Sequence, residues 1–173
     1  MEDIKIIQLD ESRWQEYKAL RILAVTESPE AFSKTPAEEE KRTDEMWKSR
    51  LEKDVTKNMV RMYFAESAGK LVGMININFH RDEKIKHIGE IGSVYVIPEF
   101  RGKGISKKLL EEAISFAKQE VKIRKVVLEV TVTQIAAVSL YEKLGFRNVG
   151  VLKDELKVGD QYLDHIYMEK LLY

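Results

Sequence analysis

Apolar positions along this chain follow two periods, which together predict a mixture of strands and helices. Short runs that alternate, or that are rich in β-branched residues, predict strands. These runs are residues 4–9, 59–66, 71–79, 90–97, 126–132, 146–157 and 162–171. Longer stretches with apolar residues at helical spacing predict helices, and several follow a capping residue. These stretches are residues 13–26, 35–51, 105–121 and 135–144.

Glycines and small polar residues mark the turns between these elements. Residues 67–70 and 158–160 each lie between two strand patterns and predict hairpins, and residues 28–33 separate the first two helices. The predicted order is a strand, two helices, three strands, a helix, a strand, a helix and two strands. That order is typical of a mixed α/β or α+β fold. A length of 173 residues suits one domain, spanning residues 1–173.

One loop carries the clearest sign of chemistry. Residues 94–97 predict a buried strand, Pro98 ends it, and Arg101-Gly102-Lys103-Gly104 leads into the helix that starts at Ile105. The first N–H groups of such a helix have no partner in the helix, and they face the loop together with the positive end of the helix dipole. The loop is therefore a predicted phosphate site. The alternative is a tight turn whose charges are simply solvated.

The loop sequence narrows the choice of phosphate ligand. It lacks the Lys-Ser/Thr ending of a nucleoside-triphosphate loop and the three glycines of a dinucleotide fingerprint. Residues 101–106, Arg-Gly-Lys-Gly-Ile-Ser, resemble instead the R-x-x-G-x-G/A loop with which the GNAT superfamily of N-acetyltransferases binds the acetyl-CoA pyrophosphate. Ser106 stands where the family usually has Gly or Ala, and it is small enough to leave the backbone approachable.

A second segment strengthens the resemblance. Residues 137–146, Ala-Val-Ser-Leu-Tyr-Glu-Lys-Leu-Gly-Phe, resemble the family's A-x-x-L-Y-E-K-L-G-F signature, and Gly145 stands where a helix C-cap is expected. Three residues before Ala137 the family often has Asn, whereas this chain has Gln134, which carries a similar amide on a longer side chain.

The resemblance implies a GNAT fold. Its central twisted sheet is mostly antiparallel, has about seven strands, is splayed at the strand before the pyrophosphate loop and is flanked by four helices. The implied reaction is direct transfer of the acetyl group of acetyl-CoA to a primary amine of a small molecule or of a peptide or protein N-terminus. The implied cofactor-binding residues are Val94, Tyr95, Val96, Arg101, Gly102, Lys103, Gly104, Ile105, Ser106 and Gln134.

Two residues are expected to carry the chemistry. A protonated amine has no lone pair, so a base must take a proton from it, and Glu90 is the candidate. Strand alternation predicts that Glu90 shares a face with Gly92, Val94 and Val96. The alternative for Glu90 is a hydrated or Lys-paired carboxylate, and His165 is an alternative base. By resemblance, Tyr141 protonates the departing CoA thiolate; its alternative is a core tyrosine.

The acceptor site is the least determined part. By resemblance it is formed by the first two helices and the last hairpin, which makes Glu27, Phe32 and Tyr162 candidate substrate residues. Further candidates are Glu30, Trp47, Asp160, Asp164 and Tyr167. For each acid, plain solvation is the competing interpretation, and for each aromatic residue it is core packing.

Composition removes several classes of function. Twenty-nine basic and 29 acidic residues give zero net charge, so no global field favours nucleic acid as a partner. No cysteine is present and the three histidines lack metal-ligand spacing, so no metal site is expected. No apolar stretch reaches the ~20 residues of a membrane helix, and a cytoplasmic location is expected. A homodimer is possible. A CoA-binding sensor without turnover and a nucleotide-binding protein are the alternative functions.

Overall fold

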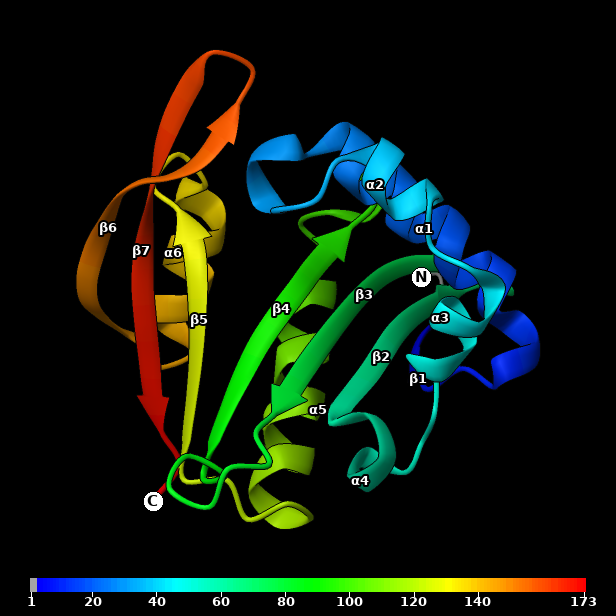
Figure 1. Cartoon of the computed structure of the whole chain (residues 1–173), viewed down its shortest axis with the longest axis horizontal. Helices are drawn as coiled ribbons and strands as arrows, with labels where there is room; N and C mark the ends of the chain where they lie inside the picture. Colours follow the sequence, from blue (N-terminus) through cyan, green and yellow to red (C-terminus); the bar gives the residue numbers. More distant parts are fainter. Residues whose placement is uncertain (1–2) are drawn as a thin grey trace.

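The computed structural model describes residues 3–173 and contains a seven-stranded sheet, shown in Figure 1. The first two residues of the predicted domain lie outside this range. The strand order is β1-β2-β3-β4-β5-β7-β6, and neighbours are antiparallel except for β4 and β5. The strands are β1 (Ile4–Ile7), β2 (Val60–Ser67), β3 (Lys70–Phe79), β4 (Ile88–Val96), β5 (Lys125–Thr131), β6 (Arg147–Val158) and β7 (Gln161–Leu171).

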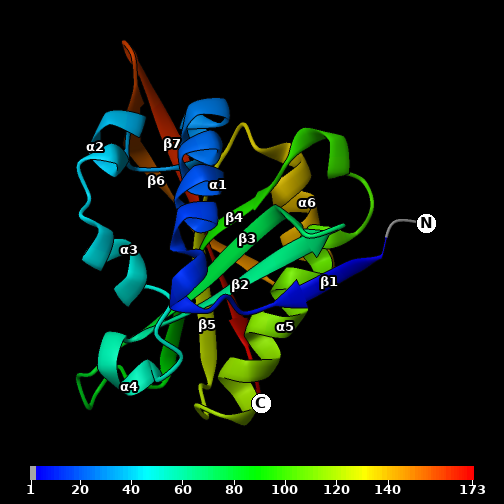
Figure 2. The same ribbon diagram turned by 90° about the vertical axis from the view of Figure 1, so that its right-hand side faces the viewer.

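Helices cover both faces of the sheet, as Figure 2 shows. Within residues 3–173 the α-helices are α1 (Trp14–Glu27), α2 (Pro36–Glu40), α3 (Asp44–Ser49), α4 (Val55–Asn58), α5 (Ile105–Gln119) and α6 (Ile135–Lys143). The short 3-10 turns are η1 (Glu11–Arg13), η2 (Pro29–Ala31) and η3 (Pro98–Phe100). Helices α1, α2 and α3 lie on one face, and α5 and α6 lie on the other. The short helix α4 precedes β2, and its Val55 packs against the core beneath α5.

Each face has its own hydrophobic core. Tyr17 of α1 packs edge-on against Trp47 of α3 and Phe64 of β2, with ring centroids 5.2 and 5.4 Å apart. On the opposite face Leu109 and Leu110 of α5 are fully buried against the sheet. Every fully buried aromatic or aliphatic side chain of this kind contributes roughly 1.5–3 kcal/mol relative to an exposed one, so both helical layers are firmly attached to the sheet.

The sheet is splayed between its two central strands, as predicted. Strands β4 and β5 run parallel but pair at only three positions, from Ile88 with Lys125 to Glu90 with Val127. Beyond Glu90 the two strands separate, and Figure 1 shows the gap widening toward the C-terminal ends of both. The backbone groups that β4 and β5 would otherwise exchange along this stretch are therefore available to a ligand.

A bulge in β4 makes the predicted alternation of this strand wrong. Asn76 of β3 pairs with Gly92, but Met74 pairs with Tyr95, so β4 contains one extra residue, and Ser93 adopts a positive φ of 53°. As a result Val94 and Val96 pack into the core beneath α5 together with Ile91, whereas Tyr95 joins the core beneath α1. Glu90 and Gly92 thus lie on the opposite face from Val94 and Val96.

The predicted helix 35–51 is also wrong as a single element. Thr35 begins α2 with a capping box that includes Glu38, but α2 ends at Glu40. Thr43 then caps a new helix, α3, by accepting a hydrogen bond from the Met46 amide. A second capping residue inside an apolar pattern starts a second helix. With the unpredicted α4, the described chain has six α-helices in place of four.

Candidate active site

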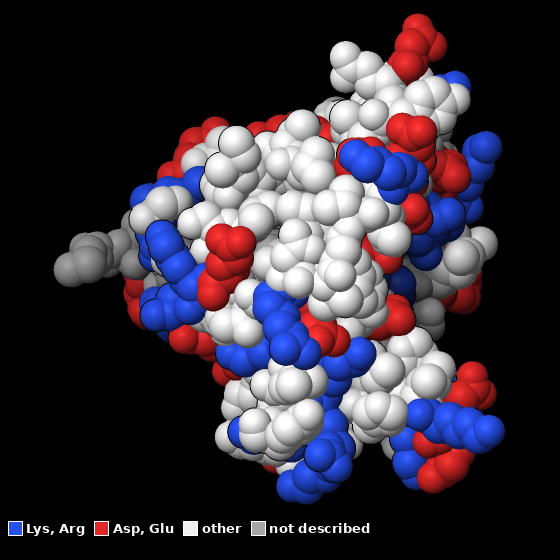
Figure 3. Space-filling model, turned by 90° about the vertical axis from the view of Figure 1, so that its left-hand side faces the viewer, with Lys and Arg blue, Asp and Glu red and all other residues white. Residues whose placement is uncertain are grey.

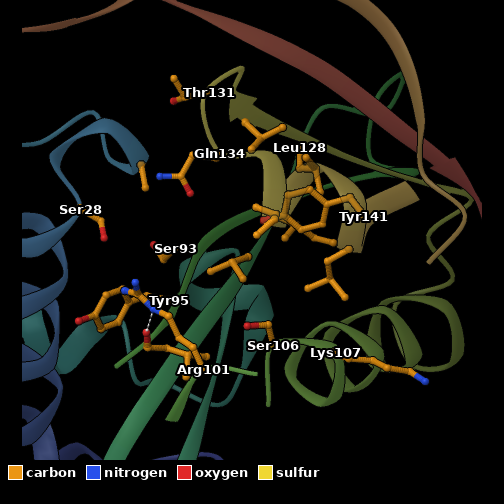
Figure 4. A pocket seen from close by; sticks show the side chains of 18 of the residues that line it. Ser28, Ser93, Tyr95, Arg101, Ser106, Lys107, Leu128, Thr131, Gln134 and Tyr141 are labelled. Atoms are coloured by element: carbon orange, nitrogen blue, oxygen red, sulfur yellow. Dashed lines mark hydrogen bonds between the residues drawn. The ribbon is translucent and has the colours of Figure 1, made fainter. Parts of the chain in front are cut away.

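The splay contains a cavity with a volume of about 680 Å³. Figure 4 shows side chains from the end of α1, from β4, from the glycine loop, from α5, from β5 and from α6 arranged around one hollow. The predicted residues Val94, Tyr95 and Val96 all line it, as does Tyr141. Segments far apart in the sequence therefore meet where the sheet is open.

The floor of this cavity is the predicted phosphate loop. Gly102 and Gly104 have φ values of 75° and 76°, a region that favours glycine, and Gly104 is the N-cap residue of α5. No side chain caps this helix, so the amides at its first turn keep their hydrogen-bonding capacity, and Ser106 lines the cavity beside them. An uncapped first turn at the base of a cavity is suited to binding an anion.

The two basic side chains of the loop do not extend into the cavity as a pair. Arg101 folds back: its Nε donates to the Val96 carbonyl at 2.9 Å, and its Nη2 lies 3.2 Å from Glu27 Oε2. The Lys103 ammonium lies 4.7 Å from the Phe100 ring centroid, and Lys103 is the loop residue that does not line the cavity. This arrangement favours the backbone amides, rather than a charge clamp, as the anion ligands.

Tyr141 lies on the α6 side of the cavity. Its side chain is 6% exposed, and its ring packs edge-on against Phe146 with centroids 5.9 Å apart. Burial raises the pKa of the Tyr141 phenol above its usual range. The hydroxyl therefore stays protonated at neutral pH and is able to give a proton to a group in the cavity.

Hydrogen bonds to η2 close the far end of the same cavity. The Gln134 side-chain amide donates to Glu30 Oε1 at 2.8 Å, and the Thr131 hydroxyl donates to the Glu30 carbonyl. Gln134 and Glu30 both line the cavity. The amide nitrogen of Gln134 is committed to Glu30, which leaves its carbonyl oxygen to interact with a ligand.

Glu27 belongs to the protein's own framework and lines neither of the cavities described here. The Tyr95 hydroxyl donates to Glu27 Oε2, which also holds Arg101. Burial, followed by this hydrogen bond, raises the pKa of Tyr95 above its usual range, so the phenol remains a donor. Glu27 thereby ties the end of α1 to β4 and to the phosphate loop.

A second cavity of about 480 Å³ lies on the α1 side of the sheet. It meets the first cavity in the splay, and the residues that line both are Ala31, Ile91, Gly92, Ser93, Leu128, Glu129 and His165. Ser93, on the bulge, accepts a hydrogen bond from Arg21 Nη1 at 3.0 Å. The bulge thus stands at the junction of the two cavities.

Glu90 lines the second cavity but not the first. Its side chain is half exposed, and its Oε1 lies 3.1 Å from His80 Nε2. Glu129, which the sequence analysis missed, lies at the junction with Oε2 3.5 Å from His165 Nδ1. The signal that could have identified Glu129 is its position as the lone acid within the apolar run of β5.

The predicted acceptor residues divide between the second cavity and other places. Phe32 lines the second cavity beneath the Arg21 guanidinium, which lies 4.5 Å from the ring centroid, and Tyr167 also lines it. Trp47 is fully buried in the core. Tyr162 is 59% exposed and lies outside both cavities. Asp160 also lies outside both cavities, and Asp164 is paired with Lys153 at 2.6 Å.

No group of three or more His, Cys, Asp or Glu side chains among residues 3–173 is arranged to hold a metal ion. Among the helices of the described chain, none combines the length and apolar character that crossing a bilayer requires.

The chain is similar in sequence and in fold to known acetyltransferases. The model of a family described as the acetyltransferase (GNAT) family matches residues 17–146. The sequence is similar to an N-alpha-acetyltransferase of Saccharolobus solfataricus, with 41% identity over 76 residues, 43% of this chain and 46% of the relative. It is also similar to a spermidine N(1)-acetyltransferase of Vibrio cholerae, with 31% identity over 65% of this chain and 64% of the relative.

The matched region thus spans about half to two thirds of these curated relatives. A solved acetyltransferase of the GNAT family from Streptococcus pneumoniae superposes with a TM-score of 0.87 at 26% identity, covering 98% of this chain and all of that one.

Proposed function

This chain belongs to the acetyltransferase (GNAT) family, and on that premise we propose that it transfers the acetyl group of acetyl-CoA directly to a primary amine of a small molecule or of a peptide or protein N-terminus. We also propose that residues 1–173 form one catalytic domain. One observation carries the proposal: the cavity in the splay and the cavity on the α1 side of the sheet share lining residues, so that a donor and an acceptor can each occupy one of them and touch.

The first cavity is assigned to the donor. The amides at the start of α5, from Ile105 onward, suit the pyrophosphate, because they are uncapped and carry the positive end of the helix dipole. On the side that faces β5, the backbone from Val94 to Val96 has no strand partner; it lies along the same cavity and suits the amide groups of the pantetheine arm. Acetyl-CoA supplies the activated acetyl group when it is bound there.

The reaction then needs three events at the junction. A carboxylate takes a proton from the acceptor ammonium, the freed nitrogen attacks the acetyl carbonyl carbon, and the carbon–sulfur bond breaks to release a thiolate. Tyr141 donates its phenolic proton to that thiolate, and solvent returns a proton to the phenolate. Nitrogen thus loses two protons, one to the carboxylate before attack and one to the carboxylate or solvent as the adduct collapses, and gains the acetyl group, while sulfur gains a proton.

We propose that the base is a carboxylate of the second cavity. Glu90, the residue that the sequence analysis favours, lines this cavity and is paired with His80, so it can act on an amine held there directly or through water. Glu129 lines both cavities, which brings it closer to the acetyl group, and His165 beside it can accept the proton in turn. Phe32 provides apolar surface for the acceptor. Glu27 and Tyr162 line neither cavity, so their positions do not support the proposed contacts with the acceptor.

Partners and location are proposed on more general grounds. We propose that the protein acts in the cytoplasm on small amines or peptides and does not bind nucleic acid. In support, Figure 3 shows basic and acidic side chains interspersed around uncharged surface on the face that carries α6 and β6. Val149 and Val151 of β6 are 54% and 45% exposed, which suits association with a second copy. Light scattering would measure the mass in solution.

Transfer is tested by mixing the purified protein with acetyl-CoA and a panel of amino acids, peptides, polyamines and aminoglycosides. Thiol release and the mass of each product are then followed. Acceptor-dependent release with an acetylated product is the expected result. Binding of CoA without any product would favour a sensor that has lost turnover. A preference for ATP or a dinucleotide over CoA would contradict the assignment of the first cavity.

A further inference from the structure

The side chains of the second cavity are divided by charge. We propose that the acceptor of this enzyme carries a carboxylate in addition to its reactive amine, and that Arg50 binds this carboxylate while Glu90 and Glu129 face the amine. The inference rests on the proposed function and adds the chemical class of the acceptor.

One wall of the second cavity is formed by α1, α2, α3 and the loops between them, and is called the helical wall below. This wall is basic. It contributes Arg21, Lys34, Arg42 and Arg50 to the cavity, against a single acid, Glu39. Glu39 is 1% exposed and is held by Arg21 at 2.8 Å on one side and by Arg42 on the other. Burial alone would raise the pKa of Glu39, but these two guanidinium groups outweigh it and lower that pKa. The carboxylate of Glu39 is thus the shared ion-pair partner of Arg21 and Arg42.

Arg50 is the basic side chain of this wall that is best placed for a ligand. It follows α3 and is partly buried, its Nε donates to the Tyr17 hydroxyl at 2.9 Å, and its Nη2 lies 3.9 Å from the Met62 sulfur. A neutral hydroxyl and a thioether leave the charge of a guanidinium uncompensated. Within residues 3–173 no carboxylate lies at ion-pair distance from it. Tyr17 fixes the orientation of the side chain, which leaves its terminal nitrogens to bind a carboxylate through two parallel hydrogen bonds.

The opposite wall is acidic. Glu90 of β4 and Glu129 of β5 are both exposed to the cavity, and each is accompanied by a histidine, His80 and His165. Of these two acids, Glu129 also lines the donor cavity. An ammonium group is therefore favoured at the sheet end of the cavity, where the acetyl group arrives, and an anion is favoured at the helical wall.

A molecule that carries both charges fits this arrangement, and a polycation does not. An amino carboxylate pairs each of its ends with the opposite charge. A polyamine would bring a second ammonium against Arg50, where like charges repel in a partly buried site. The volume of about 480 Å³ accommodates acceptors from a single amino acid to a short peptide.

The test compares acceptors that differ only in the carboxylate. α-Amino acids, ω-amino acids such as 6-aminohexanoate, and dipeptides are each assayed beside their carboxamides, with spermidine as the polycation. Wherever an acceptor and its carboxamide both react, the acceptor with the free carboxylate is expected to have the higher kcat/KM, by about tenfold or more. A ratio of this size corresponds to the free energy of a charge-assisted hydrogen bond.

Three variants connect this preference to Arg50. Arg50→Gln is expected to lower kcat/KM for the carboxylate about tenfold or more and to leave the carboxamide nearly unchanged, so that the preference disappears. Arg50→Lys keeps the charge without the planar fork and is expected to restore part of the preference. Lys48→Gln is the matched control, because it removes a positive charge from α3 at a side chain that lies over Trp14, outside both cavities. Thermal unfolding confirms that each variant is folded.

The outcomes are separable. Product formed equally from carboxylates and carboxamides, or faster from spermidine, overturns the inference while confirming transfer to an amine. If no compound yields product, transfer fails, and calorimetry with the same carboxylates in the presence of CoA decides the inference. If the wild type binds the carboxylates and Arg50→Gln weakens that binding about tenfold, the inference is supported. If no heat signal is seen, or if the substitution leaves the affinity unchanged, the inference is overturned.

Discussion

Tyr141 shows how a single residue derives its chemistry from its surroundings. In water its phenol would lose its proton near pH 10, but burial in α6 beside Phe146 keeps the phenol neutral well above that pH. The phenol therefore carries its proton over the whole neutral pH range, which the proposed role as an acid toward a thiolate requires. Its position within the A-x-x-L-Y-E-K-L-G-F segment predicted its identity, whereas its burial is visible only in the folded chain.

The first prediction concerns this hydroxyl. Tyr141→Phe is expected to lower kcat about 100-fold and to leave the KM for acetyl-CoA within about twofold, because the proton is needed only as the carbon–sulfur bond breaks. Stopped-flow measurement of acetyl transfer in a single turnover checks this. In the wild type, kcat is not expected to fall between pH 8 and about 10, since the raised pKa keeps the phenol protonated there. Full turnover in the variant would assign the proton to another donor.

The second prediction concerns Glu90 and Glu129, the two acids that the sheet contributes to the second cavity. Glu129→Gln is expected to reduce kcat/KM for the acceptor more than Glu90→Gln does, because Glu129 lines both cavities while Glu90 lines one and is half exposed. A loss of about 100-fold for the base and a smaller loss for the other acid are expected. The pH dependence of kcat/KM for each variant identifies the base, since its replacement abolishes the acidic limb. A greater loss in Glu90→Gln would restore Glu90 to that role.

At the scale of an element, the turn from β4 into α5 depends on backbone conformation. Gly104→Ala introduces a Cβ that meets no protein atom within 4 Å, but at a φ of 76° it strains the loop and projects toward the anion site. CoA affinity is expected to fall about tenfold or more, against about threefold or less for Lys103→Ala, as calorimetry will show.

Gly159→Ala supplies the control for the loop. Gly159 also has a positive φ, 60°, and open space around its Cβ position, but it lies in the β6–β7 turn outside both cavities. Its substitution is expected to cost about 1 kcal/mol of folding stability, as Gly104→Ala does, without a change in CoA affinity. A larger effect of Lys103→Ala than of Gly104→Ala on CoA binding would mean that charge, rather than backbone, holds the phosphates.

The helical wall yields a prediction about stability. Glu39→Gln leaves Arg21 and Arg42 without their shared carboxylate, and it is expected to lower the free energy of unfolding at pH 7 by about 3 kcal/mol. Because the pKa of Glu39 is lowered in the folded state, its contribution is present above the pKa of the unfolded chain and is lost as pH falls. The difference between variant and wild type should therefore shrink toward acidic pH. Glu40→Gln, at an exposed neighbour, should change stability by less than about 0.5 kcal/mol.

Some elements of the fold could be predicted from the sequence and others could not. Strands and the long helices α1 and α5 follow from periodicity, because their buried faces repeat over several turns or alternations. The bulge at Ser93 could not be predicted, since one extra residue in β4 leaves no mark in an apolar run, yet it moves Glu90 and Val94 to opposite faces. The break between α2 and α3 was foreseeable from Thr43, whose capping role competes with an apolar pattern that continues through Trp47.

For the whole molecule, the weak pairing across the splay implies a response to ligand. Three backbone pairs join β4 to β5, so a donor that contacts β4, α5 and α6 together is expected to stabilise the fold. At 100 times its Kd, CoA should add about 2.7 kcal/mol, which corresponds to a rise in Tm of about 5–10 °C for a chain of this size. Calorimetric melting with increasing CoA tests the dependence on concentration. A Tm that does not respond to saturating CoA would contradict binding in the splay.

The architecture was predictable from the sequence, and the acceptor cavity was not. The order of elements indicated a mixed fold, and the family resemblance carried by two segments implied the seven-stranded sheet and its splay, because the residues of each segment are contiguous in sequence. The second cavity collects single residues such as Arg50, Glu90 and Glu129, which belong to three separate elements and carry no shared spacing. Only the packing of α1–α3 over the sheet brings them together.

The presence of two adjoining cavities, one in the splay and one on the α1 side of the sheet, has a consequence for steady-state kinetics. If the donor occupies one cavity and the acceptor the other, as proposed, neither has to leave before the other binds, and double-reciprocal plots at varied concentrations of both should intersect rather than run parallel. An unreactive analogue of the amine should then inhibit without competing against acetyl-CoA, and free CoA should inhibit without competing against the amine. In that arrangement the two reactants would meet at the residues that line both cavities, among them Ser93 of the bulge.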